Sequence, residues 1–243
     1  MRFGIIGAGP IASNIAKKLV KNRHDVKIAD ARGIERLEGK ELAGTPVSVE
    51  NVITNIDVLI ISIPFHAVPS IRKVVDQVGE EVVVVDTSNY YPQISNKMEE
   101  IENGMVESVW VSNQLGRPII KAFNNLLAYT LEHEGTPEGT SGRIAIAIAG
   151  DNQSHKQIIM KVANELGFDA VDSGSLSDSW RQQPGTPAYC TELTKEELTE
   201  ALNKANKEKA PLLRDKAIEK LSAAPGGYSH KDIVNLNREI YNS

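Results

Sequence analysis

The sequence predicts an α/β protein with a doubly wound, mostly parallel sheet and a helical appendage at its C-terminal end. Short runs rich in Val and Ile alternate with helix patterns through the first two thirds of the chain. Runs that are apolar on both faces are typical of strands buried between two layers of helices. A glycine turn, Gly7-Ala8-Gly9, also follows the first run and precedes the first helix pattern. Together these observations indicate a Rossmann-type sheet, which binds ligands at the carboxyl ends of its strands.

The elements of this sheet can be placed in chain order from the apolar patterns. Strands are expected at residues 3–6, 26–29, 58–61, 82–86, 119–123, 144–149 and 168–171. Helices are expected between them at residues 11–20, 67–78, 108–115, 126–133 and 154–166. Because strands joined through helices need crossover connections, these strands should run parallel to one another.

The last fifty or so residues lack a strand pattern and read as exposed helices. Residues 194–221 are rich in Lys, Glu, Ala and Leu, and Pro211 should end or kink a helix there. Gly226-Gly227 breaks the pattern, and Ser229 can cap a final helix over residues 230–241. We therefore expect a dinucleotide-binding domain at residues 1–190 and an appendage at 191–243 that is not an independent domain.

Composition narrows the class of protein. The net charge of −5 argues against a nucleic-acid binder, which would carry a basic stripe. The single cysteine, Cys190, cannot form an internal disulfide. The apolar runs are too short to span a bilayer, and the first residues lack the pattern of a targeting signal. A cytoplasmic protein without a membrane or nucleic-acid partner and without a metal site is expected.

The glycine turn has the residues that a pyrophosphate site requires. Gly7 permits the tight turn, Gly9 lets the backbone approach a phosphate closely, and Ala12 is small enough for the helix to pack on the strand. The first helix, entered through Pro10 and Ile11, then presents free N–H groups and a partial positive charge. A glycine turn without a ligand is the alternative.

The residues at the end of the second strand should determine whether the protein prefers NAD(H) or NADP(H). Two of them favour different cofactors. Asp30 could bond the ribose 2′-hydroxyl of NAD(H), whereas Arg32 could pair with the 2′-phosphate of NADP(H). Asp30 could instead cap a helix over residues 32–37. The residues alone leave the choice open.

Three further strings stand where strands end and could hold a nicotinamide ring. They cover residues 62–66, 86–92 and 121–125. Asn89 and Asn124 could contact the cofactor or be ordinary strand-end amides, Lys121 could contact an anion or simply end a strand, and His66 could be an acid–base residue or a helix cap. The expected contacts from these strings are Ile63, Pro64, Phe65, Asn89, Lys121, Ala122 and Asn124.

A polar, proline-marked segment at residues 172–189 follows the last expected strand. A loop of this length inside a compact domain is usually functional. It could form a wall of the substrate site, or serve as a structural clasp or subunit contact.

These strings, taken together, resemble a known family. GAGPIA, VLIISIPFHAV, VVVVDTSNYYP, LGRPIIKAFNN, AIAGDN and GFDAVDSGSLSDSWRQQPGTPAYCTEL look like the NADPH-dependent reductases of the deazaflavin coenzyme F-420, and most like their bacterial branch of NADP oxidoreductases. The KAFN and GSL elements are also similar to the cytosolic reductase domain of the STEAP ferric reductases. The resemblance covers nearly all of residues 1–193.

The resemblance implies a single dinucleotide-binding domain and hydride transfer between NADP(H) and a flavin-like or other small acceptor. The family usually reads the 2′-phosphate with a Ser-Arg pair; Arg32 matches, but Ala31 replaces serine and Asp30 precedes it, so NAD(H) stays open. The protein then supplies proximity and orientation, and no catalytic residue is named.

Two other functions stay open. One is an imine or carbonyl reductase related to pyrroline-5-carboxylate reductase or the β-hydroxyacid dehydrogenases, although these usually have a larger helical C-terminal domain than this short tail. The other is a protein that binds NADP without turnover. A homodimer is expected, because the tail and residues 180–189 offer apolar surface to a second copy.

Overall fold

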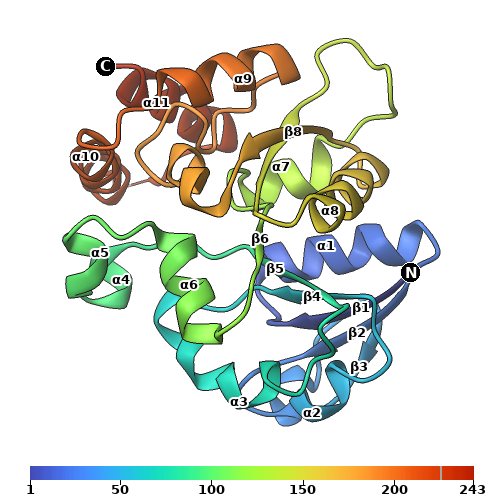
Figure 1. The fold of residues 1–243 in the computed structure, drawn as a ribbon. Helices are drawn as coiled ribbons and strands as arrows, with labels where there is room; N and C mark the ends of the chain where they lie inside the picture. Colours follow the sequence, from blue (N-terminus) through green and yellow to red (C-terminus); the bar gives the residue numbers. More distant parts are fainter. Residues whose placement is uncertain (225) are drawn as a thin grey trace.

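The computed structural model describes residues 1–224 and 226–243 and is drawn in Figure 1. Within these residues an eight-stranded sheet has the order β3-β2-β1-β4-β5-β6-β7-β8. Its strands are β1 (Arg2–Ile6), β2 (Asp25–Ala29), β3 (Thr45–Pro46), β4 (Val58–Ile61), β5 (Val83–Asp86), β6 (Ile120–Lys121), β7 (Ala145–Ala149) and β8 (Asp169–Gly174). Every pair is parallel except β6 and β7, which meet antiparallel. The expected doubly wound, mostly parallel sheet is confirmed.

Helices cover both faces of the sheet, as the strand patterns require (Figure 1). One face packs on α1 (Pro10–Lys21), α7 (Ala128–His133) and α8 (Gln153–Glu165). The other packs on α2 (Val49–Val52), the 3₁₀ helix η2 (Phe65–Ile71), α3 (Arg72–Val75) and α6 (Glu107–Leu115). Because successive side chains of a strand point to opposite faces, Ile5 lies in the first core and Ile6 in the second.

Four short helices complete the connections between strands. They are η1 (Ile34–Leu37), α4 (Pro92–Ser95), α5 (Glu99–Glu102) and η3 (Leu176–Gln182). Each spans seven residues or fewer. Isolated helices this short are not stable in water, so tertiary contacts must hold them in place.

The tail forms α9 (Lys195–Lys204), α10 (Ala210–Ser222) and α11 (His230–Tyr241). Leu198, Ala201 and Leu202 of α9 pack against β7 and β8, while α10 and α11 pack on Tyr189 and Cys190. The Ser229 cap is confirmed, because its hydroxyl accepts the Asp232 N–H in a capping box.

Three local expectations were wrong. Pro211 neither ends nor kinks a helix but lies in the first turn of α10, where its missing N–H costs nothing. The helix expected over residues 67–78 is divided into η2 and α3, with Pro69 inside η2. β6 has two residues rather than five, because Phe123 adopts a positive φ of 60° and ends the extended backbone.

None of the helices in residues 1–224 and 226–243 is long and apolar enough to cross a membrane.

Candidate functional site

A cleft of about 360 Å³ opens where β1, β4 and β5 end. Its position at the carboxyl ends of parallel strands, beside the point where the strand order reverses, is where doubly wound folds bind ligands. Three segments line it, after β1, β4 and β5 in turn: Gly9, Pro10, Ile11, Ser62, Ile63, Pro64, Phe65, Thr87, Ser88, Asn89, Tyr91, Ile94 and Ser95. The structure thus brings the glycine turn together with Ile63, Pro64, Phe65 and Asn89.

Gly7 and Gly9 lack side chains for different reasons. Gly7 has a φ of +127°, and a Cβ on it would lie 2.1 Å from the Ser62 carbonyl oxygen, so the approach of β4 requires glycine there. A Cβ on Gly9 would meet no protein atom within 4 Å, and its φ of −80° suits any residue. The fold therefore does not require glycine at position 9, and the free space before it faces the cleft.

The start of α1 is open to an anion. Gly9 is the N-cap residue, no side chain caps it, and Pro10 occupies the first turn. Ala12 is fully buried and lets α1 pack closely on the sheet. The free N–H groups of a 12-residue helix consequently point toward the space before Gly9, and this arrangement fits a pyrophosphate.

Asp30 and Arg32, which gave opposite signals in the sequence, form one ion pair. Asp30 Oδ1 accepts the backbone N–H and the Nε–H of Arg32 at 2.9 and 3.1 Å, and Oδ2 accepts Nη2–H at 3.2 Å. The Asp30 carboxyl is 9% exposed and the Arg32 side chain 68%. The hydrogen bond from the Arg32 side chain lowers the pKa of Asp30.

This pairing engages both Asp30 oxygens and leaves the exposed guanidinium of Arg32 as the outward group. Asp30 does not cap a helix over residues 32–37, since η1 begins after Gly33, which is its N-cap residue. That alternative interpretation of Asp30 was wrong.

Lys121, Ala122 and Asn124 lie behind the cleft and do not line it. Lys121 is 1% exposed, and its Nζ donates to Asp86 Oδ2 at 2.6 Å and to the Ser88 carbonyl oxygen. Ala122 is buried in the core. Asn124 donates to Asn89 Oδ1 at 3.0 Å and accepts from Gln182 Nε2 at 2.9 Å. Lys121 and Asn124 thus hold the turn after β5, which does line the cleft.

The segment at residues 172–189 folds inward at its end. Gln182, Thr186, Tyr189 and Cys190 are buried, and burial raises the pKa of the Cys190 thiol to about 12. None of these residues lines the cleft, but the Tyr189 hydroxyl accepts a hydrogen bond at 2.8 Å from Tyr91, which does. His66 is exposed and lies outside the cleft lining.

Glu107 is a buried carboxyl that no sequence pattern singles out, because it resembles any acid at the start of a helix. It is 2% exposed, and Oε2 accepts the Tyr90 N–H at 3.0 Å. Burial raises its pKa to about 7, although the positive charges of Lys121 and Arg214 oppose the rise.

Glu107→Gln is expected to remove a pH dependence of stability. The pKa of Glu107 rises from 4.5 in the unfolded chain to about 7 in the folded protein. The stability that Glu107 contributes is therefore complete below its unfolded pKa of 4.5 and is lost as the pH rises through its folded pKa of about 7. The loss amounts to about 3 kcal/mol in all. Urea unfolding across this range should show a shallower decline for Glu107→Gln, while Glu99→Gln on exposed α5 should follow the wild type. An unchanged slope would contradict this pKa.

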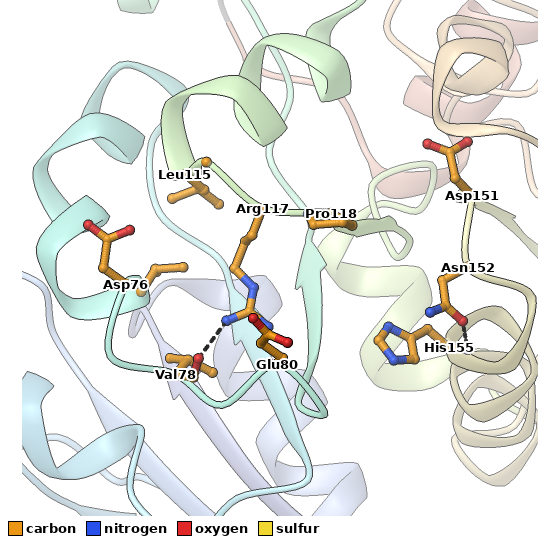
Figure 2. Close-up of a pocket in the computed structure, with 11 residues that line it drawn as sticks. Asp76, Val78, Glu80, Leu115, Arg117, Pro118, Asp151, Asn152 and His155 are labelled. Atoms are coloured by element: carbon orange, nitrogen blue, oxygen red, sulfur yellow. Dashed lines mark hydrogen bonds between the residues drawn. The ribbon is translucent and has the colours of Figure 1, made fainter.

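A second cavity of about 630 Å³ lies at the amino ends of β5 and β6, on the opposite side of the sheet from the carboxyl ends of these strands. It is also beside the start of α8. Figure 2 shows Arg117 reaching across it to Val78. Its guanidinium donates to the carbonyl oxygens of Val78, Gly79 and Val82 at 3.0, 3.0 and 3.1 Å. Asn152 caps α8 by accepting the His155 N–H at 3.0 Å. Because these side chains already satisfy the backbone groups around this cavity, the cleft at the carboxyl ends of the strands is the stronger candidate site.

In the part of the chain that the structure describes, no group of three or more His, Cys, Asp and Glu side chains could hold a metal ion.

Comparison with known proteins gives a family match for the first part of the chain. The model of the family described as NADP oxidoreductase, coenzyme F-420-dependent, matches residues 2–90. The Escherichia coli (strain K12) protein YjhV is 40% identical over 114 residues, which make up 45% of this chain and 80% of YjhV.

Two solved structures show the same fold. The hypothetical protein SMa0349 from Sinorhizobium meliloti superposes with a TM-score of 0.67 at 28% identity, covering 80% of this chain and 96% of that one. An Arthrobacter sp. FB24 protein, provisionally described as an F-420-dependent NADP reductase, has a TM-score of 0.58 at 16% identity, covering 74% of this chain and 87% of that one.

Proposed function

The chain belongs to the family of coenzyme F-420-dependent NADP oxidoreductases, and from this premise we propose that it transfers hydride between NADP(H) and a flavin-like small molecule. The observation that carries the proposal is the free space before Gly9, at the uncapped start of α1. A Cβ at this position would stand in the space where the pyrophosphate would lie.

Different residues of the cleft would bind different parts of the cofactor. The N–H groups at the start of α1 would bind the pyrophosphate, and Arg32 would bind the 2′-phosphate. Ile63, Pro64 and Phe65 on one side and Asn89 on the other would enclose the nicotinamide end. When bound, the cofactor supplies the hydride; the protein orients the two rings and excludes water.

The cleft lining supports an acceptor that needs no proton from the protein. Its side chains are apolar, hydroxyl or amide groups, and the hydroxyl proton of Tyr91, its one phenol, is already donated to Tyr189. A flavin or deazaflavin ring can accept hydride beside such neutral groups, whereas a carbonyl compound needs a proton donor at its oxygen. We therefore prefer the flavin-like acceptor to a carbonyl compound.

The acceptor can be tested by rapid mixing of protein and NADPH with FMN, FAD, a deazaflavin or a panel of imines and carbonyl compounds, followed by the absorbance of the reduced nicotinamide. Oxidation with the flavin-like group alone is expected. Oxidation only with imines or carbonyl compounds would favour the reductase alternative, and binding without turnover on any acceptor would favour a non-catalytic protein.

Arg32→Ala is expected to weaken NADPH binding by about tenfold or more, because a charge-assisted bond to the 2′-phosphate contributes roughly 1.5–3 kcal/mol. NADH binding should change little. Calorimetric titration of both cofactors measures the ratio, and Arg36→Ala controls for the loss of one positive charge on the neighbouring η1. An equal effect on NADH and NADPH would contradict the role of Arg32 and return the discrimination to Asp30.

We further propose that the tail, residues 191–243, is an appendage of the domain at 1–190 and that the chain forms a homodimer. The exposed Leu212 of α10, at 72%, supports a partner on this side, whereas Tyr189 is already buried within the chain. A monomer by light scattering at micromolar concentration would contradict the dimer. A cytoplasmic location stays a prediction.

A further inference from the structure

One wall of the cleft is a short segment with little structure of its own. Residues 89–95 follow β5 and contribute Asn89, Tyr91, Ile94 and Ser95 to the lining. The only helix in this wall, α4, has four residues. Because such a helix is not stable alone, contacts from elsewhere must set the position of the wall.

Three of these contacts come from the last third of the chain. The Arg214 guanidinium of α10 lies over the Tyr90 ring, 5.5 Å from its centre. The Tyr91 hydroxyl donates to Tyr189 at 2.8 Å, and Gln93 Nε2 donates to Asp215 Oδ1 at 3.1 Å. The tail, through Arg214 and Asp215, and Tyr189 just before it thus hold the wall at three points within four consecutive residues.

Arg214 is the most deeply placed of these groups. It is 5% exposed, although it is always charged. Its Nε donates to Asp215 Oδ1 at 2.8 Å, the same oxygen that receives Gln93. A buried arginine is costly unless its surroundings compensate for the charge. Here the compensation comes from Asp215 on one side and from the ring of Tyr90 on the other.

The contact of Arg214 reaches the backbone of the wall. The Tyr90 ring is completely buried against Phe65, with ring centres 5.5 Å apart. The backbone N–H of Tyr90 donates to Glu107 Oε2 at 3.0 Å. Phe65 lines the opposite wall of the cleft. Tyr90 therefore connects its own wall to the opposite one behind the cleft, and a shift of its ring would change their separation.

We infer that Arg214 is a positioning residue for the nicotinamide: through Tyr90 it fixes the wall at residues 89–95 at the distance that the ring requires. This inference rests on the proposed function, because it assigns the nicotinamide to this wall. It gives the tail a role in the cleft without any direct contact with the cofactor.

The test compares two ligands that differ only in the nicotinamide. NADP⁺ and 2′-phospho-ADP-ribose are titrated by calorimetry into the wild type, Arg214→Met and Arg214→Lys. Arg214→Met should weaken NADP⁺ binding by about tenfold and leave the affinity for the fragment within about twofold. Arg214→Lys keeps the charge but not the planar group, so its affinity for NADP⁺ should fall between those of the wild type and Arg214→Met.

The control is Arg238→Met on α11. Arg238 also forms hydrogen bonds that hold the tail together, by donating to the carbonyl oxygens of Thr191 and Glu192 at 2.7 Å each, but it does not contact the wall. Its replacement should change neither affinity. If it weakened NADP⁺ binding as Arg214→Met does, the effect would belong to the tail in general and the inference would be overturned.

Tyr189→Phe offers a milder variant, since it removes only the hydroxyl that holds Tyr91. It should weaken NADP⁺ binding more than fragment binding. If Arg214→Met and Tyr189→Phe both weakened the two ligands equally, or weakened neither, the inference would be overturned while the proposed function would stand. Failure of the wild type to bind either ligand would contradict the proposed function and the inference with it.

Discussion

Lys121→Met is expected to lower the free energy of unfolding by about 3–5 kcal/mol, because it leaves a buried carboxylate without its counter-charge. Asp86 is 0% exposed and Lys121 1%, and their 2.6 Å contact is shielded from water. Lys121 also donates to the Ser88 carbonyl oxygen. Urea unfolding at neutral pH measures the loss.

Two variants separate this effect from a general response to losing a lysine. Lys204→Met breaks an exposed pair with Glu200 on α9, and such pairs contribute at most about 0.5 kcal/mol. Asp86→Asn combined with Lys121→Met removes both charges and should recover part of the stability. A loss below about 1 kcal/mol in Lys121→Met would show that the pair does not stabilise the fold.

Gly9→Val is expected to weaken NADPH binding by about 100-fold or more while the protein stays folded, since two charge-assisted bonds to phosphate would be lost. A Cβ at position 9 meets no protein atom within 4 Å, so the valine side chain would extend into the space that the proposed pyrophosphate occupies. Valine is a poor N-cap residue, and the stability should fall by no more than about 1 kcal/mol. Calorimetry and thermal melting measure the two quantities separately.

Gly226→Val is the matched control, because a Cβ there also meets nothing within 4 Å and the residue lies outside the cleft lining. It should bind NADPH as the wild type does. Normal NADPH binding by Gly9→Val would remove the glycine turn from the proposed site.

Much of the sheet follows from the sequence because its strands are apolar on both faces. β1, β2, β4 and β5 begin within one residue of the expected positions. The edge strand β3 was missed, since it consists of Thr45 and Pro46 alone. No apolar run marks so short a strand, and proline is tolerated there only because the strand lies at the edge.

The candidate site was predictable where local backbone geometry decides it and less so where partners come from distant segments. Gly7, Gly9 and Pro64 follow directly from strand ends, and all three lie at the cleft or shape it. Lys121 is the last residue of β6, but its side chain is buried because it pairs with Asp86 on the neighbouring strand. The burial of Glu107 could not be predicted, because it results from the packing of α6 against Tyr90.

The tail illustrates the same limit. Its helices were expected from their composition, and α11 has the expected bounds of residues 230–241. That Arg214 and Asp215 would meet residues 90–93 could not be expected, because no sequence pattern relates two segments more than a hundred positions apart.

A crystal structure of the protein with NADP⁺ tests the central claim most directly. The account predicts the pyrophosphate before Gly9 at the start of α1, the 2′-phosphate beside Arg32, and the nicotinamide between Pro64 and Asn89. Cofactor bound instead in the cavity beside Arg117 and His155, or with its pyrophosphate away from the glycine turn, would contradict it.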